Sequence, residues 1–130
     1  MDNIIKEITN DIYKELSYLH LETVYQRAFG LELQIRNIRN LQETNLNIKY
    51  KGLNVGFCRL DMVIIDEKNN KYIIEFKAIN KITKKEKNQI LKYLQQSPIT
   101  TAYLLNFGGL KQEILKFKKD NNKINIETLL

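Results

Sequence analysis

Two stretches near the start of the chain place apolar residues at three- and four-residue steps, the period of an amphipathic helix. The first set is Ile4, Ile5, Ile8, Ile12 and Leu16, and the second is Leu21, Val24, Ala28, Leu31 and Ile35. Each set predicts one apolar helix face turned towards a core. The connecting letters, SYLHLE, indicate a corner between the two helices, with Ser17 as a candidate cap.

After the polar stretch RNIRNLQETN the pattern changes to that of β-strands. NLNIKY alternates, a tight KG turn follows, LNVGFCRLDMVII continues as a long strand, and DEKNN turns the chain into KYIIEFKAI. Thr83 and Glu86 have capping-box spacing, which predicts a helix from Thr83 to Gln96 that Pro98 closes. TTAYLLNF predicts a strand, LKQEILKFKKD a helix and KINIETL a last strand. The order α-α-β-β-β-α-β-α-β predicts an α/β fold, a mixed sheet flanked by helices.

Composition narrows this picture. The 130 residues, 43% of them apolar, are enough for one domain with its own core, spanning 1–130. No apolar run is long enough to cross a membrane, and no secretory signal is readable, so no membrane partner is expected. A single cysteine, Cys58, cannot form an internal disulfide, which favours a reducing, intracellular compartment, cytoplasmic or, in a eukaryotic or viral setting, nuclear or in a viral factory.

The formal net charge of +6 favours polyanionic partners, nucleic acid first. The chain is also rich in Asn, Ile and Lys, the residues of A/T-rich codons. Biased genome composition therefore explains the excess of lysine equally well. The sequence leaves the oligomeric state open, a homodimer included.

Candidate chemistry lies on the strand KYIIEFKAI. Glu75 and Lys77 are two residues apart, so both side chains leave the same face of the strand. If this strand pairs as a hairpin with the preceding one, Asp61 lies across from them. Two carboxylates beside an ammonium suit divalent-metal phosphodiester chemistry, since Mg²⁺ takes oxygen ligands and keeps several waters. A bound metal activates water, and a lysine stabilises developing negative charge.

At this point the sequence resembles the PD-(D/E)xK nuclease superfamily, and within it the GxxExxR family. The resemblance covers roughly residues 19–109 and rests on five stretches in order: LETVYQRAFGLEL, YKGLNVGFCRLDMVI, IIEFKAI, NQILKYL and AYLLNFG. It implies a restriction-endonuclease-like fold with an αβββαβ core and a mixed sheet of four to five strands. It also implies a hydrolase that uses Mg²⁺ or Mn²⁺ to cleave nucleic acid.

The site residues that the resemblance implies are carried over by position. Asp61 and Glu75 match the metal-binding acids, Lys77 matches the active-site lysine, and Glu22 matches a first-helix glutamate that faces the metal. Gln89 and Tyr93 match a QxxxY helix, and their i, i+4 spacing places both on one helix face. The sequence departs from the family pattern at three places, Leu19 for glycine, Tyr25 for arginine and Leu60 for proline.

Each candidate also has a structural interpretation. Glu75 and Lys77 could form a cross-strand ion pair, Asp61 could be a strand-end acid, and Glu22 could serve only the helix N-terminus. Gln89 and Tyr93 could be a polar stripe beside buried residues. Arg59 could contact phosphate or form an outward ion pair. We expect Cys58 to be a packed strand residue, His20 to lie outside the site, and the lysines of KITKKEKNQILK to be a solvated face or a phosphate track.

The function expected from these residues is metal-dependent hydrolysis of DNA phosphodiester bonds with little base specificity. Glu22, Asp61 and Glu75 would hold the metal, Lys77 would help to activate water, and Gln89 and Tyr93 would position the nucleic-acid strand. The main alternative is a catalytically inactive nucleic-acid-binding module of the same fold. A purely structural protein, in which Glu75 and Lys77 only pair with one another, is the third.

Overall fold

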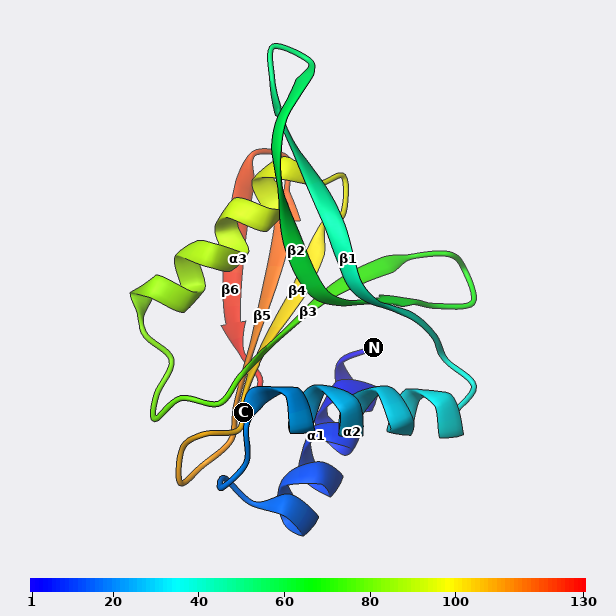
Figure 1. The fold of residues 1–130 in the computed structure, drawn as a ribbon, viewed down its shortest axis with the longest axis vertical. Helices are drawn as coiled ribbons and strands as arrows, with labels where there is room; N and C mark the ends of the chain where they lie inside the picture. Colours follow the sequence, from blue (N-terminus) through cyan, green and yellow to red (C-terminus); the bar gives the residue numbers. More distant parts are fainter.

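A computed structural model describes all residues from 1 to 130 and shows one six-stranded mixed sheet with three helices (Figure 1). The strands are hydrogen-bonded in sequence order: β1 (Arg39–Tyr50), β2 (Leu53–Ile65), β3 (Lys71–Lys77), β4 (Thr101–Asn106), β5 (Glu113–Asp120) and β6 (Lys123–Thr128). Only β3 and β4 run parallel, and α3 (Lys84–Gln96) connects them. The predicted α/β fold is confirmed, and the sheet has one strand more than the four to five expected.

The sheet separates two apolar cores. On one face α1 (Asp2–Leu16) and α2 (Glu22–Ile35) pack against alternate residues of the central strands, among them Met62, Ile74 and Phe76. On the other face α3 covers Val63 and Ile73. Because side chains alternate along a strand, β2 and β3 have apolar residues on both faces where they cross the core.

The stretch 110–120 contains a strand, β5, and not the expected helix. LKQEILKFKKD contains β5, which pairs with β4 on one side and β6 on the other. Leu115 and Phe117 are buried under α3 while Lys116 and Lys118 point the other way, which is the two-residue period of a strand. The lysines mask that period, because their spacing also fits a helix surface.

The core-facing side of α2 also differs from the expectation. Leu31 and Ile35 are exposed, whereas Tyr25, Phe29 and Leu33 are fully buried at four-residue steps. The aromatic rings fill more of the core than the expected stripe would, so they determine how the helix is rotated. Ser17, the candidate cap in the corner, is the C-cap residue of α1, and Leu21 is the residue that precedes α2.

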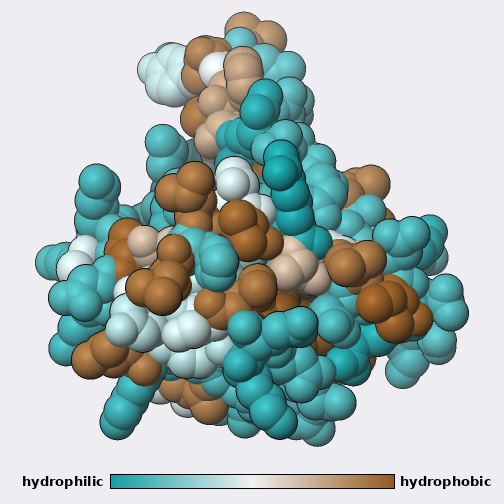
Figure 2. Space-filling view, turned by 60° about the horizontal axis from the view of Figure 1, so that its bottom comes forward, coloured by the Kyte–Doolittle hydropathy of each residue, from teal (hydrophilic) through white to brown (hydrophobic).

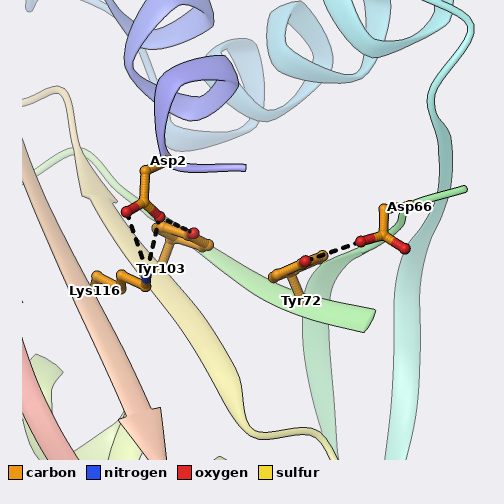
Figure 3. Close-up of polar contacts among 5 residues, drawn as sticks. All are labelled: Asp2, Asp66, Tyr72, Tyr103 and Lys116. Carbon is orange, nitrogen blue, oxygen red and sulfur yellow. Dashed lines mark hydrogen bonds and ion pairs between the residues drawn. The ribbon is translucent and has the colours of Figure 1, made fainter. Parts of the chain in front are cut away.

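The end of the chain that carries Met1 is fixed to the sheet through Asp2. The Asp2 carboxylate accepts a hydrogen bond from the Tyr103 hydroxyl and forms an ion pair with Lys116, whose Nζ lies 3.0 Å from Oδ1 (Figure 3). Nearby, the Tyr72 hydroxyl donates to Asp66 Oδ2 at 3.0 Å. These contacts hold α1 and the β2–β3 turn against the sheet.

Exposed apolar side chains are not evenly distributed over the surface. Large apolar side chains are exposed on α2 and on the loops at the bottom of the molecule, where brown and teal surfaces are interspersed (Figure 2). None of the helices has the length and apolar character that crossing a membrane would require.

Candidate active site

Asp61 and Glu75 come together where β2 and β3 separate. Their ladder ends at the pair Met62 and Ile74, and the next residues in register are Asp61 and Glu75. The Asp61 backbone N–H donates to Glu75 Oε1 at 3.4 Å, and Asp61 Oδ2 accepts the N–H of Phe76 at 2.9 Å. Each carboxylate thus reaches across to the opposite strand in place of a ladder hydrogen bond.

Glu75 is a buried carboxyl group, with only 3% of its surface exposed. Burial raises its pKa, and the negative charge and hydrogen bond of Asp61 raise it further, while Lys77 opposes the rise; the pKa of Glu75 is about 8. Without a cation Glu75 therefore keeps its proton at neutral pH. A divalent cation beside it would offset the repulsion from Asp61 and let Glu75 ionise.

Tyr93 and Gln89 on α3 fix the other oxygen of Glu75. The Tyr93 hydroxyl donates to Glu75 Oε2 at 3.3 Å, and Gln89 Nε2 donates to the Tyr93 hydroxyl at 2.8 Å. Burial and the neighbouring Glu75 raise the pKa of Tyr93, so the phenol keeps its proton and remains a donor. Tyr93 is 4% exposed, so it contacts Glu75 from within the core.

Lys77 and Glu22 face one cleft of about 540 Å³ between the start of α2, the end of β3 and α3. Burial raises the pKa of Glu22; the Lys77 ammonium offsets part of this rise, and the charge on Asp61 adds to it. Glu22, Lys77 and Asp61 are therefore near enough to interact electrostatically. The residues that line the cleft are Glu22, Lys77, Ile79, Lys85, Glu86, Asn88, Gln89 and Lys92.

The donor set fits a hard divalent cation held by two carboxylates. No three His, Cys, Asp or Glu side chains lie close enough to form a metal cluster by themselves, so Glu22 does not complete one with Asp61 and Glu75. Mg²⁺ is commonly held in proteins by one or two carboxylates together with water and substrate phosphate. The contact between Asp61 and Glu75, two carboxyl groups on neighbouring strands, matches that requirement.

Gln26 is a further residue of the site that the sequence reasoning did not single out. Its Nε2 donates to the backbone oxygen of Asp61 and to Gln42 Oε1, each at 3.0 Å, and its side chain is buried. It thus ties α2 to the point where β2 leaves β3. The signal was present in the sequence: Gln26 lies four residues after Glu22, on the same helix face.

Asn106 holds the loop that follows Lys77. Asn106 is the last residue of β4 and is fully buried. Its Oδ1 accepts the N–H of Ile79 at 3.0 Å and of Gly108 at 3.1 Å, and its Nδ2 donates to Glu113 Oε2 at 2.8 Å. A Cβ on Gly108 would lie 2.2 Å from the Ile79 nitrogen, so only glycine permits this approach.

The remaining candidates lie outside the site or contribute only backbone. Arg59 is exposed and forms no ion pair, and its carbonyl oxygen lies 3.5 Å from the Tyr93 hydroxyl. His20 is exposed beside Tyr25, and Cys58 is half-buried against the α3 core, as expected of a packed strand residue. Tyr25, at the arginine position of the family pattern, is buried and stacks on Phe107 with ring centroids 4.5 Å apart.

Comparison with known proteins identifies the family. No curated protein and no solved structure matches the chain significantly. A family model described as the PD-(D/E)XK nuclease superfamily matches residues 1–117, which include all the strands of the site and the acids and lysine placed on them. The superfamily is one of nucleases, and the mixed sheet agrees with its restriction-endonuclease-like fold. The chain belongs to the PD-(D/E)XK nuclease superfamily.

Proposed function

We propose that this protein is a Mg²⁺- or Mn²⁺-dependent nuclease that hydrolyses phosphodiester bonds of DNA with little base specificity. The observation that carries the proposal is the contact between Asp61 and Glu75 beside the cleft that Lys77 lines. The GxxExxR family, which the quoted sequence stretches resemble, is the branch of the superfamily to which we assign it.

Asp61 and Glu75 are the proposed metal ligands, and Glu22, which lines the neighbouring cleft, is a third acid that acts through a metal-bound water. A divalent cation bound there would polarise the scissile phosphate and lower the pKa of an attached water. Lys77 supplies positive charge where negative charge develops, and it lines the cleft with Glu22 as its acidic neighbour.

Gln89 and Tyr93 have two roles in this proposal. Gln89 lines the cleft, where its amide reaches a nucleic-acid strand, and Tyr93 keeps Glu75 in place through its hydroxyl group. Low base specificity is expected in this proposal where the contacts are to phosphates, because such contacts alone carry no sequence information.

The test is cleavage of linear and circular DNA by purified protein with Mg²⁺, Mn²⁺, Ca²⁺ or EDTA. We expect cleavage with Mg²⁺ or Mn²⁺ and none with EDTA, and loss of cleavage in both Glu75→Ala and Lys77→Ala. A matched control is Glu127→Ala, at an exposed position of β6. Full activity in Glu75→Ala would refute the site. DNA binding without cleavage under every metal would favour the inactive binding module.

A further inference from the structure

The strands β1 and β2 extend far beyond the sheet as a two-stranded arm. Only Met62–Ile65 of β2 pair with β3, so Leu53 to Asp61 pair with β1 alone and project from the body (Figure 1). Lys51 and Gly52 at the tip have φ of 50° and 79°, the conformation of a tight hairpin turn. We refer to residues 44–60 as the arm.

The arm exposes apolar side chains although a two-stranded ribbon gains little stability from doing so. Leu53 is 72% exposed, and three others, Tyr50, Val55 and Phe57, are each 62% exposed. In the space-filling view the arm at the top shows apolar and polar surfaces side by side (Figure 2). Exposed apolar groups at the end of an extended element indicate a contact surface.

The arm has one free face, which is the face turned away from α3. Leu46 and Cys58 pack against the α3 core, so the alternate residues Asn47 and Phe57 face away from α3. Near the base the strands exchange faces: Leu60 packs in the α3 core, whereas Met62, two residues further along β2, packs on the α2 side. Glu43, in this part of β1, has φ of 50°.

This exchange makes the free face continuous with the surface beside α2. Gln42 lies opposite Met62, which packs on the α2 side, so Gln42 and the free face of the arm share that side. At its base is a pocket of about 600 Å³ lined by Arg27, Gly30, Gln34, Asn37, Ile38, Arg39, Asn40 and Gln42.

The arm and the lining of the pocket carry charge of one sign. The arm carries three cations, Lys49, Lys51 and Arg59, and no acidic residue. The pocket contributes two arginines and six uncharged residues, four of them amides, without a carboxylate. None of the arm cations forms an ion pair within the chain, and Lys51 Nζ lies 5.4 Å from the centroid of the Tyr50 ring.

We propose that the free face of the arm and the pocket at its base bind a nucleic-acid duplex next to the active site, with the arm lying in a groove. This inference rests on the proposed function, and it names the substrate as double-stranded. Lys49, Lys51 and Arg59 contact phosphates, while Val55 and Phe57 pack against the groove and the base edges. Cations, amides and aromatic rings without acids are the composition of a nucleic-acid surface.

The length of the arm agrees with binding to a nucleic-acid duplex. Asp61 lies nine residues from Gly52 along β2. At roughly 3.3 Å per residue the tip is about 30 Å from the proposed metal ligands, close to one turn of B-form DNA. The major groove of B-form DNA admits a two-stranded β-ribbon. A second copy of the chain fits less well, because two arms facing each other would bring like charges together.

The first experiment measures duplex binding in Ca²⁺ or EDTA, so that cleavage is not required. The arm variant Lys49→Gln/Lys51→Gln/Arg59→Gln is compared with Lys111→Gln/Lys118→Gln/Lys123→Gln, which removes the same charge from exposed positions near or on β5 and β6. For a duplex of about two helical turns, we expect the slope of log Kobs against log[salt] to fall by about 2–3 in the arm variant, since each phosphate contact contributes about 0.9. Equal losses in both variants would overturn the proposal.

The second experiment tests the apolar contact. Phe57→Ser should weaken duplex binding about tenfold without changing the salt slope, whereas Leu110→Ser, which removes an exposed apolar side chain from the β4–β5 loop, should bind as wild type. Unchanged affinity in Phe57→Ser would overturn the assignment. So would sedimentation showing a wild-type dimer that Phe57→Ser dissociates, because the arm would then be a subunit contact.

The two proposals fail separately. If wild-type protein cleaves duplex DNA and the arm variants cleave it with unchanged KM, the arm assignment is wrong and the nuclease function stands. If binding depends on the arm but no metal supports cleavage, the nuclease function is wrong and the arm assignment stands.

Discussion

Tyr93 donates a hydrogen bond to Glu75 Oε2 from within the α3 core, at 3.3 Å. The tyrosine is 4% exposed, and its hydroxyl in turn accepts from Gln89. The helix after β3 therefore holds the buried carboxyl group of the proposed metal site in one orientation. Residues that act in this way are positioning residues, and their loss should affect turnover more than substrate binding.

Tyr93→Phe removes the hydrogen bond to Glu75 and the one from Gln89 and leaves the ring. A buried carboxylate that loses a hydrogen bond costs about 1–3 kcal/mol, so we expect kcat for DNA cleavage to fall roughly 10- to 100-fold with little change in KM. Steady-state kinetics over a range of Mg²⁺ concentration measure this. Tyr72→Phe is the matched control, because that hydroxyl bonds Asp66 in the β2–β3 turn. A rise in KM alone would mean that Tyr93 binds substrate.

Gly108→Ala should disturb the loop that follows Lys77. The added Cβ would lie within 2.5 Å of backbone atoms of Ala78 and Ile79, which cannot move aside like a side chain. We expect a loss of roughly 2–3 kcal/mol in the free energy of unfolding, and cleavage activity per folded molecule should also fall. Urea denaturation and activity assays test this. Gly56→Ala, in open space on the arm, is the control and should be neutral in both.

The residues of these two predictions differ in how well the sequence predicts their roles. The strands that carry Asp61, Glu75 and Lys77 were predictable, because dense β-branched and aromatic residues bounded by turn residues define them. Asn106 and Gly108 were seen only as a turn. Their role depends on a parallel pairing of β3 and β4 across a helix, and local patterns do not specify such long-range neighbours.

The two incorrect predictions, the helix at 110–120 and the core-facing side of α2, have the same cause. The helix expected at 110–120 is β5, because an edge of β4 inside the fold needs a hydrogen-bonding partner on that side. The wrong face of α2 was expected because Leu31 and Ile35 are more apolar than Tyr25, although the aromatic ring buries more surface. In both places tertiary packing outweighs local periodicity.

Glu75→Gln should change how stability depends on pH in the metal-free protein. The pKa of Glu75 is about 8 in the folded state and 4.5 ordinarily, so the folded protein holds an extra proton between these values. Stability from this group is therefore complete below about pH 4.5 and is lost as pH rises towards 8. We expect Glu75→Gln to be more stable than wild type at pH 8, by about 1 kcal/mol or more.

Adding Mg²⁺ should reverse that order. Millimolar Mg²⁺ raises the Tm of wild type, because a ligand that binds only the folded state stabilises it, whereas Glu75→Gln should not respond. Thermal unfolding at pH 5 and pH 8, with and without Mg²⁺, gives both results. An equal response of wild type and variant would show that the metal binds elsewhere.

Asp2→Asn should lower the stability of the protein at neutral pH and leave it unchanged at low pH. Burial opposes ionisation of Asp2, but hydrogen bonds from Tyr103 and Lys116 more than offset it and hold its pKa below the ordinary 3.8. The stability from Asp2 is then present above about pH 3.8 and is lost as pH falls through the lower folded pKa. We expect Asp2→Asn to cost about 1 kcal/mol or less at pH 7, since solvent screens the pair, and nothing at pH 2. Asp120→Asn, exposed at the β5–β6 turn, should show no such difference.

The proposed role of Asp61 and Glu75 in holding the catalytic metal ion can be tested with a crystal of the wild-type protein soaked in Mn²⁺. We expect an anomalous difference peak between the carboxylates of Asp61 and Glu75, at roughly 2.0–2.3 Å from an oxygen of each, on the side that faces Lys77. A map with Mn²⁺ bound only at other residues, or with none at saturating concentration, would contradict it.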